Sequence, residues 1–379
     1  MKKRVLALIA AASMLITMVG CGGAKQAPDK TAPEATTPEA TTQKKAIAKE
    51  DIKVGFLYVG PIGDEGYTYA HDQGRLQLEK ELGVKTVYVE NVPENIDCEK
   101  TVRDLIDQGC NVIYATSFGH GEWAYNVSKE FPNVYFGHAT GYEKSDNFSN
   151  YMGRIYEARY LSGIAAGLKT KDGKIGYVAA MPIPEVIRGI NAFTLGVRSV
   201  NPEATVTVKW TNSWYDPTLE KAAAIELINT GCDVIGQHCD TTGPQTAAQD
   251  KGVFAVGYNA PTLSAAPDAY LTAPLFHWGE YYVADVQSII DGTWQSQSYW
   301  KGLESGIVSL DELSPNCAEG TAEAIDAAKA KILDGSLFVF TGPLKDNTGK
   351  EKVAAGEKMT DEQLTSFDWF VEGVVGTIG

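Results

Sequence analysis

A pattern of short apolar strands alternating with helices occurs twice in the sequence, and it limits the possible folds more than any other feature. In the first half, helical stretches such as 69–82 and 99–108 separate the strand-like runs 54–59, 86–90, 112–116 and 134–137. In the second half, helical stretches near 186–200 and 217–229 separate the runs 174–179, 205–210, 233–236 and 254–257. Strands that alternate with helices build parallel sheets covered on both faces. The sequence therefore predicts an α/β protein with two doubly wound units.

Two nine-residue segments, 105–113 and 227–235, support this duplication because they match almost position for position. Each is typical of a helix end, a capping glycine and a buried strand. The match makes Cys110 and Cys232 equivalent small residues at the start of a strand. A chain of this length does not need disulfides, although a bridge between Cys232 and Cys239 remains an alternative.

The first fifty residues have the layout of an export signal followed by a linker. Three basic residues at 2–4 precede an apolar run at 5–19, which as a helix would span roughly 22 Å, short of the ~30 Å hydrocarbon core. We therefore predict a signal peptide at 1–20 and a disordered tether at 21–50, rich in Ala, Pro, Thr, Lys and Gln. Residues 18–21, Met-Val-Gly-Cys, resemble the bacterial lipobox. That resemblance implies cleavage before Cys21, lipid on Cys21, and an anchor on the outer face of a cell membrane, in a Gram-positive surface or a periplasm.

Charge and missing motifs exclude several classes of function. The net charge of −15 becomes −18 without the three basic residues of the predicted signal, which argues against nucleic acid as a partner. The chain has no Gly-x-Ser-x-Gly and no His-Glu-x-x-His motif. His120, His138 and His238 fall on predicted crevice loops, but no helical histidine pair or cysteine pair supports a metal site. We predict a protein that is not an enzyme and has neither metal nor cofactor.

The loops that leave the carboxyl ends of parallel strands line a crevice, and here they carry aromatic, amide and carboxylate side chains. Tyr67 and Trp214, one from each unit, could stack on the two faces of a flat ring, while Asp64 and Asp240 could accept hydrogen bonds from its N–H groups. A planar heterocycle with donors fits this set, and a sugar is the alternative. The candidate ligand-binding residues are Asp64, Tyr67, Thr68, Tyr69, Ser117, Phe118, His138, Trp214, Tyr215, Asp240, Tyr258 and Asn259.

A long, ordered series of motifs resembles the basic membrane protein family, the purine-receptor-like substrate-binding lipoproteins of ABC importers. The motifs are Gly-Phe-Leu-Tyr at 55–58, Asp-Glu-Gly-Tyr at 64–67, the segment 151–163, Arg-Gly-Ile-Asn-Ala-Phe at 188–193 and Trp-Tyr-Asp-Pro at 214–217. The resemblance implies a type I periplasmic-binding-protein fold of two lobes joined by a three-segment hinge. The hinge crossings would lie near 151–154, 272–276 and 300–307. The first lobe would comprise 51–153 with about 274–302, and the second 154–273 with about 303–379.

The same resemblance implies a purine ligand, with Tyr67 stacking from the first lobe, Trp214 or Tyr215 from the second, and Asp240 reading the ring edge. Nucleoside-binding relatives usually have Asn where this chain has Thr68, and an acidic ribose loop where it has Gly-Tyr-Asn-Ala at 257–260. The resemblance therefore favours a free base such as adenine over a nucleoside. A monomer would deliver the base to an ABC permease and its ATPase. Alternatives are a binding protein for another flat heterocycle or a sugar, a surface-anchored sensor, and an extracytoplasmic nucleoside or sugar hydrolase.

Overall fold

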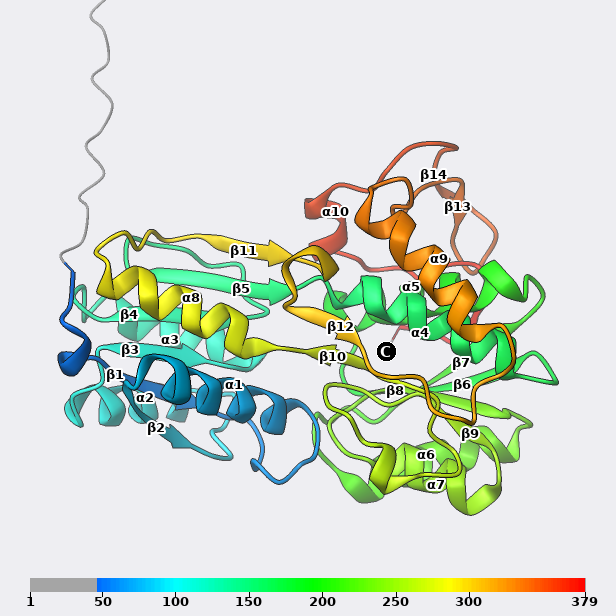
Figure 1. Cartoon of the computed structure of the whole chain (residues 1–379), viewed down its shortest axis with the longest axis horizontal. Helices are drawn as coiled ribbons and strands as arrows, with labels where there is room; N and C mark the ends of the chain where they lie inside the picture. The colour runs from blue at the N-terminus through cyan, green and yellow to red at the C-terminus, as the bar shows by residue number, and fades with distance from the viewer. Residues whose placement is uncertain (1–45, 379) are drawn as a thin grey trace, which may run out of the picture. The chain divides into compact units, whose positions relative to one another are not determined.

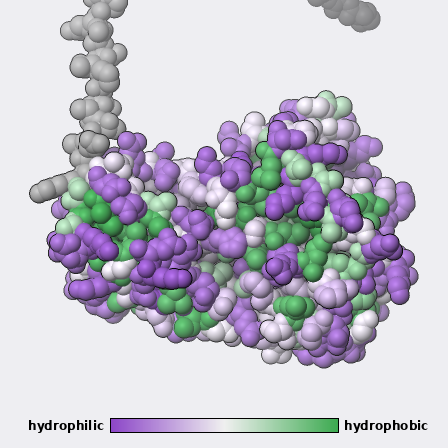
Figure 2. All heavy atoms as spheres, in the orientation of Figure 1, coloured by the Kyte–Doolittle hydropathy of each residue, from purple (hydrophilic) through white to green (hydrophobic). Residues whose placement is uncertain are grey.

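A computed structural model describes residues 46–378 of the chain. The predicted signal peptide, Cys21 and nearly all of the predicted tether lie outside the described residues. Within 46–378, none of the helices combines the length and the apolar character needed to cross a membrane. On the face drawn in Figure 2, hydrophilic side chains predominate.

The first of two parallel sheets has six strands in the order β11-β5-β4-β3-β1-β2. Helices α1 and α8 pack together on one face, and α2 and α3 pack together on the other (Figure 1). We call this sheet with its helices the first lobe. Its elements are β1 (Lys53–Leu57), α1 (Tyr67–Leu82), β2 (Lys85–Val89), α2 (Asp97–Asp107), β3 (Val112–Ala115), α3 (Gly121–Ser128), β4 (Tyr135–Ala139), β5 (Phe148–Gly153), α8 (Trp278–Ile290) and β11 (Ser298–Lys301).

The second parallel sheet has five strands in the order β15-β7-β6-β8-β9. Helices α4 and α5 pack together beside it, α6 pairs with α7, and α9 packs on α4. We call this sheet with its helices the second lobe. Its elements are α4 (Ile155–Lys169), β6 (Lys174–Ala179), α5 (Pro184–Val200), β7 (Thr205–Trp210), α6 (Pro217–Asn229), β8 (Val234–His238), α7 (Gly243–Lys251), β9 (Phe254–Ala255), α9 (Thr321–Leu333) and β15 (Val374–Val375).

The chain passes between the two lobes three times (Figure 1). The first passage joins β5 to α4, the second contains β10 (Pro274–Phe276), and the third joins β11 to β12 (Val308–Leu310). Strands β10 and β12 pair antiparallel, so two of the passages are hydrogen-bonded to each other. The predicted α/β fold with two doubly wound lobes and a three-segment hinge is confirmed, whereas the exact lobe boundaries remain a prediction.

The repeated nine-residue segment forms the same corner in both lobes. Gly109 and Gly231 have φ angles of 92° and 100°, a left-handed conformation that favours glycine. The N–H groups of Cys110 and Cys232 donate to carbonyls five residues earlier, at 3.1 and 3.3 Å, and both cysteines are buried. Cys232 and Cys239 are free thiols, so the alternative of a bridge between them is wrong.

The last forty residues pack back on the second lobe. They form β13 (Leu344–Lys345), β14 (Glu351–Val353) and α10 (Asp361–Thr365) before β15 joins the sheet. Phe340, Phe367 and Phe370 are buried in the same core cluster as the β6 and α5 side chains. Arg188 on α5 donates from Nη1 to the Leu364 carbonyl at 2.7 Å. We call residues 338–378 the C-terminal segment.

Candidate functional site

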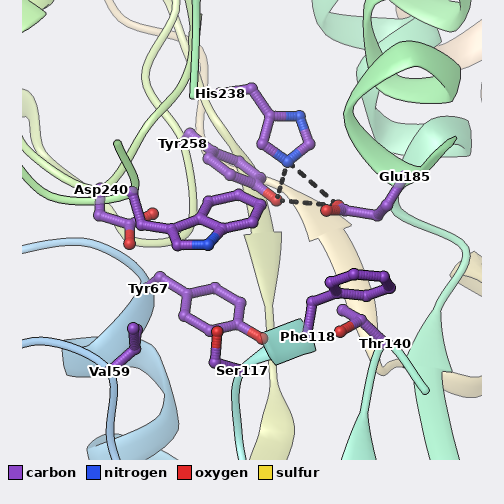
Figure 3. A pocket seen from close by; sticks show the side chains of 10 residues that line it. Val59, Tyr67, Ser117, Phe118, Thr140, Glu185, His238, Asp240 and Tyr258 are labelled. Atoms are coloured by element: carbon purple, nitrogen blue, oxygen red, sulfur yellow. Dashed lines mark hydrogen bonds and ion pairs between the residues drawn. The ribbon is translucent and has the colours of Figure 1, made fainter. Parts of the chain in front are cut away.

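A cavity of about 340 Å³ lies between the loops at the carboxyl ends of the two sheets (Figure 3). We call it the ring cavity. Its lining is largely apolar with a few polar groups, which is usual in small-molecule sites. Six of the twelve predicted ligand-binding residues line it. The lining residues are Val59, Tyr67, Ser117, Phe118, Thr140, Glu185, Trp214, His238, Asp240 and Tyr258.

Tyr67 is the first residue of α1, and its ring is held firmly by the first lobe. Its hydroxyl donates to the Thr116 carbonyl at 2.6 Å, and its ring meets His71 and Trp278 edge-on, with centroids 4.5 and 6.2 Å away. Burial raises the pKa of Tyr67 well above its usual value, so the phenol stays neutral. A ring fixed in this way offers a preorganised stacking surface.

Trp214 comes from the loop between β7 and α6 in the second lobe. The Asp216 side chain caps α6 by accepting from the N–H groups of Thr218 and Leu219, at 3.1 and 2.9 Å, as its position before Pro217 predicts. The Trp214 carbonyl accepts from the Asp240 N–H at 3.1 Å. This bond joins the loop after β7 to the loop after β8, so the indole and the Asp240 carboxylate come from connected backbone.

Asp240 is buried, with 4% of its surface exposed. Within residues 46–378 no hydrogen bond to its carboxylate is present, although it lines the ring cavity. Burial raises its pKa well above the usual value, and the negative charges of Asp64, Glu220 and Glu185 add to the effect. A buried carboxyl group without a protein partner is available to a ligand.

Glu185, His238 and Tyr258 form a linked group on the opposite side of the ring cavity from Asp240 (Figure 3). His238 Nε2 lies 3.1 Å from Glu185 Oε1 and 3.2 Å from the Tyr258 hydroxyl. The Arg159 guanidinium lies 3.6 Å above the centroid of the Tyr258 ring. These three side chains hold one another, so the polar end of the cavity is preformed.

The charges of this group follow from burial and from its cationic neighbours. Burial acts to raise the pKa of Glu185, but His238, Arg188 and Arg159 outweigh it and bring the pKa below its usual value. Burial lowers the pKa of His238. Glu185 is therefore held in its ionised form, with Oε1 3.1 Å from His238 Nε2.

The other six predicted residues do not line the ring cavity. The Asp64 carboxylate accepts from the N–H groups of Gly66, Thr68 and Tyr69, at 2.8, 2.8 and 2.9 Å, and so fixes the start of α1. Burial raises its pKa to about 6 against the opposing effect of these three donors. Thr68 is buried behind the loop, whereas Tyr69 is 37% exposed.

His138, Tyr215 and Asn259 also lie away from the lining. His138 Nε2 is 2.8 Å from the Ser117 carbonyl, so it supports a residue that does line the cavity. Tyr215 is 39% exposed, and Asn259 is buried with a φ of 68° in the loop after β9. In the part of the chain that the structure describes, no three His, Cys, Asp or Glu side chains are grouped so that they could hold a metal ion.

Four lining residues were not among the predicted ones: Val59, Thr140, Glu185 and His238. All four follow the carboxyl end of a strand or end one, so the crevice rule contained the signal for them. His238 ends β8, and Thr140 directly follows β4. Glu185 lies in the first turn of α5, and its partner His238 is 53 positions away, so only the fold brings the two together.

The lobes touch across the mouth of the ring cavity. A Cβ atom added to Gly66 of the first lobe would lie 2.1 Å from the Asp240 carbonyl oxygen of the second. The Thr242 hydroxyl donates to Glu65 across the same gap at 3.4 Å. These contacts define a closed arrangement in which a ligand would be enclosed by both lobes.

Solved structures identify the fold. A solute-binding protein of an ABC transporter from Aeropyrum pernix K1 superposes with a TM-score of 0.68 at 19% identity, over 84% of this chain and 98% of that one. One from Conexibacter woesei gives 0.64 at 20% identity, over 76% and 98%. The fold is thus the one found in solute-binding proteins of ABC transporters.

Sequence comparison gives the family. Residues 51–337 match the family described as ABC transporter substrate-binding protein PnrA-like, and the chain belongs to this family. A purine-binding protein from Brucella abortus is 43% identical over 87% of this chain and 94% of its own length. A putative ABC transporter glucose-binding protein from Haloferax volcanii is 40% identical over 87% and 82%. The predicted resemblance is confirmed, and the family is defined by substrate binding rather than by catalysis.

Proposed function

We propose that this protein captures a purine in the ring cavity and delivers it to an ABC permease. The observation that carries the proposal is the buried Asp240 carboxylate, which has no hydrogen-bond partner among residues 46–378 and lies in one cavity with Tyr67 and Trp214 from the two lobes. A flat ring between two aromatic side chains would be stacked on both faces, while its N–H groups reach the carboxylate. The 43% identity to a purine-binding protein supports this reading.

The lining favours a flat ring over a sugar, the ligand named for the Haloferax volcanii relative. Tyr67, Phe118, Trp214 and Tyr258 give the cavity four aromatic rings. A sugar presents hydroxyl groups around its whole edge and needs many polar partners in a closed site. Three polar lining side chains, Glu185, His238 and Tyr258, are already bonded to one another. That leaves Ser117, Thr140 and Asp240 for the hydroxyl groups of a sugar.

We further propose that a free base such as adenine binds more tightly than its nucleoside. The loop at 257–260 carries no carboxylate, and within it the Tyr258 hydroxyl is already bonded to His238 while the Asn259 side chain is buried outside the lining. A free base has a ring N–H where a nucleoside carries ribose, and that N–H suits an acceptor such as Asp240. The predicted export signal and the lipid on Cys21 would hold the protein as a monomer outside the cytoplasm, beside its permease.

Calorimetry on the purified domain, unfolded and refolded to remove any retained ligand, tests the proposal with adenine, adenosine, inosine and glucose. We expect adenine to bind most tightly, with no turnover of any ligand. Native mass spectrometry before refolding should detect a purine carried over from the expression host. Tighter binding of adenosine or inosine than of adenine would refute the preference for the free base. Binding of glucose without binding of any purine would refute the proposed function itself.

A further inference from the structure

A second, larger cavity adjoins the ring cavity. Its volume is about 980 Å³, and it shares Phe118, Thr140 and Glu185 with the ring cavity. We call it the side cavity. One wall comes from the edge of the first lobe at β5 and β11, and the facing wall comes from α5 and α10 of the second lobe. Its other lining residues are Gly141, Tyr142, Asn150, Met152, Arg188, Ser298, Tyr299, Trp300, Asp361, Glu362 and Thr365.

The two cavities meet on the side of the ring cavity that faces away from Asp240. In Figure 3, Asp240 lies on one side, and the shared residues Phe118, Thr140 and Glu185 lie on the other. Asp240 does not line the side cavity. A ring held with one edge at Asp240 therefore turns its opposite edge toward the side cavity.

The side cavity is more polar than the ring cavity, and its lining carries an excess of negative charge. Its lining contains three acidic residues, Glu185, Asp361 and Glu362, and one basic residue, Arg188. Arg188 donates from Nη1 to the Leu364 carbonyl at 2.7 Å, and its guanidinium lies 4.9 Å above the Trp300 ring, so the lining keeps a formal charge of −2 with this cation included. Such a lining repels an anionic group and accepts hydroxyl or ammonium groups.

The wall formed by α10 belongs to the C-terminal segment, which lies beyond the residues 51–337 that match the family. It is held in place across the lobes, because the Trp300 indole N–H on β11 donates to Asp361 Oδ1 at 3.0 Å. The side cavity is thus completed by a segment outside the part of the chain that the family model matches.

We propose that the side cavity binds the substituent of a substituted purine, on the ring edge opposite Asp240, and that it selects uncharged hydroxylated or cationic substituents over anionic ones. The inference rests on the proposed function, because it assumes a purine in the ring cavity. With the imidazole N–H of a free base at Asp240, the opposite edge carries the 6-amino group. The ligand class then includes adenines substituted on that amino group.

Calorimetry with matched adenines tests this assignment. One set carries a hydroxyethyl, an aminoethyl or a carboxymethyl group on the 6-amino nitrogen, and a second set carries the same groups on ring nitrogen 9. In the first set, we expect the hydroxyethyl and aminoethyl compounds to have affinities within about tenfold of that of adenine, and the carboxymethyl compound to bind more weakly. All compounds of the second set should bind more weakly than those of the first. Adenine binding without measurable binding of any 6-substituted compound overturns the inference alone, as does tighter binding of the second set. Absence of adenine binding overturns the proposed function instead.

A charge reversal in the C-terminal segment isolates the side cavity. Glu362→Lys changes an exposed residue of the α10 wall. We expect it to weaken binding of the aminoethyl compound and to strengthen binding of the carboxymethyl compound, each by up to about fivefold. Glu351→Lys makes the same charge change on β14, away from both cavities, and should leave the ratio of the two affinities unchanged. Equal ratios in both variants would show that α10 does not face the substituent and would overturn the inference.

Discussion

Replacing Asp240 by Asn should stabilise the ligand-free protein and weaken ligand binding at the same time. In the unfolded chain the carboxylate is in water, whereas in the folded protein it is 4% exposed and lacks a hydrogen-bond partner among residues 46–378. Burial and the neighbouring negative charges raise the free energy of the ionised carboxylate in the folded protein. A neutral amide of the same shape avoids the charge. We therefore expect the free energy of unfolding to rise by about 1 to 2 kcal/mol at pH 8.

The pH dependence gives this prediction its sign. The folded pKa of Asp240 is raised, so between the unfolded and the folded pKa the folded state binds more protons than the unfolded state. The wild type then loses stability as the pH rises through the folded pKa, and the Asn variant does not. The two proteins should be about equally stable near pH 4, with the gap opening as the pH increases. Urea unfolding of both proteins at a series of pH values measures it.

Ligand affinity should change in the opposite direction. A hydrogen bond from a ring N–H to a charged acceptor contributes about 1.5 to 3 kcal/mol, so Asp240→Asn should weaken adenine binding by about 10- to 150-fold. Asp285→Asn is the control, because it also removes a buried carboxylate, one that accepts from Tyr114 and Trp294 and lines neither cavity. It should leave the affinity unchanged. A wild type as stable as Asp240→Asn at pH 8, or unchanged affinity in that variant, would refute the role given to Asp240.

Three further predictions concern the ring, the closure and the core. Trp214→Ala should weaken adenine binding by about 5- to 150-fold, because stacking on the indole is lost. Tyr215→Ala, at the exposed neighbouring residue, should change the affinity by about twofold at most. If calorimetry ranks the two variants the other way, Tyr215 is the residue that stacks on the ring. Gly66→Ala should weaken adenine binding at least about tenfold, because the new Cβ would lie 2.1 Å from the Asp240 carbonyl oxygen. Gly63→Ala is the control, since a Cβ at that position has no neighbouring atom within 4 Å. Equal affinities of the two variants would show that closure does not need the close contact at Gly66. Burial raises the pKa of Asp285 to about 6. Between pH 4 and 7 the wild type should therefore lose up to about 3 kcal/mol of stability relative to Asp285→Asn. A difference in unfolding free energy that stays constant over this pH range in urea titrations would contradict the raised pKa.

The fold was predictable because local sequence patterns determine most of its helices, strands and turns. Strand and helix periods, the capping glycines Gly109 and Gly231, and the Asp216–Pro217 helix start each depend on residues close in sequence. The family resemblance implied the two lobes and the three hinge crossings, whereas the order of the strands within each sheet was not predicted. The packing of the C-terminal segment could be expected from its aromatic residues, but its place in the second sheet through β15 could not, because a two-residue strand has no periodicity to detect.

The lining of the ring cavity was predictable only in part, because the sequence gives the loops but not the direction of each side chain. Asp64 looked as suitable as Asp240 for reading a ring edge, yet its oxygens are taken by three backbone N–H groups of its own turn. The Glu185–His238 pair needs two elements from different parts of the chain to meet. Exposure separates Trp214 from Tyr215, and exposure depends on how the second lobe packs, not on the dipeptide itself.

Under the proposed function, the turn at 64–67 would couple ligand binding to closure of the lobes. Asp64 fixes the start of α1, and that start sets the Tyr67 ring against its neighbours. Between these two residues lies Gly66, and the Asp240 backbone approaches it so closely that no side chain fits at position 66. The residue whose carboxylate lines the cavity is therefore also the residue whose backbone closes it. A ring that bonds to Asp240 and lies on Tyr67 interacts fully with both only when the lobes are closed, and this differential affinity is what shifts the population toward the closed state.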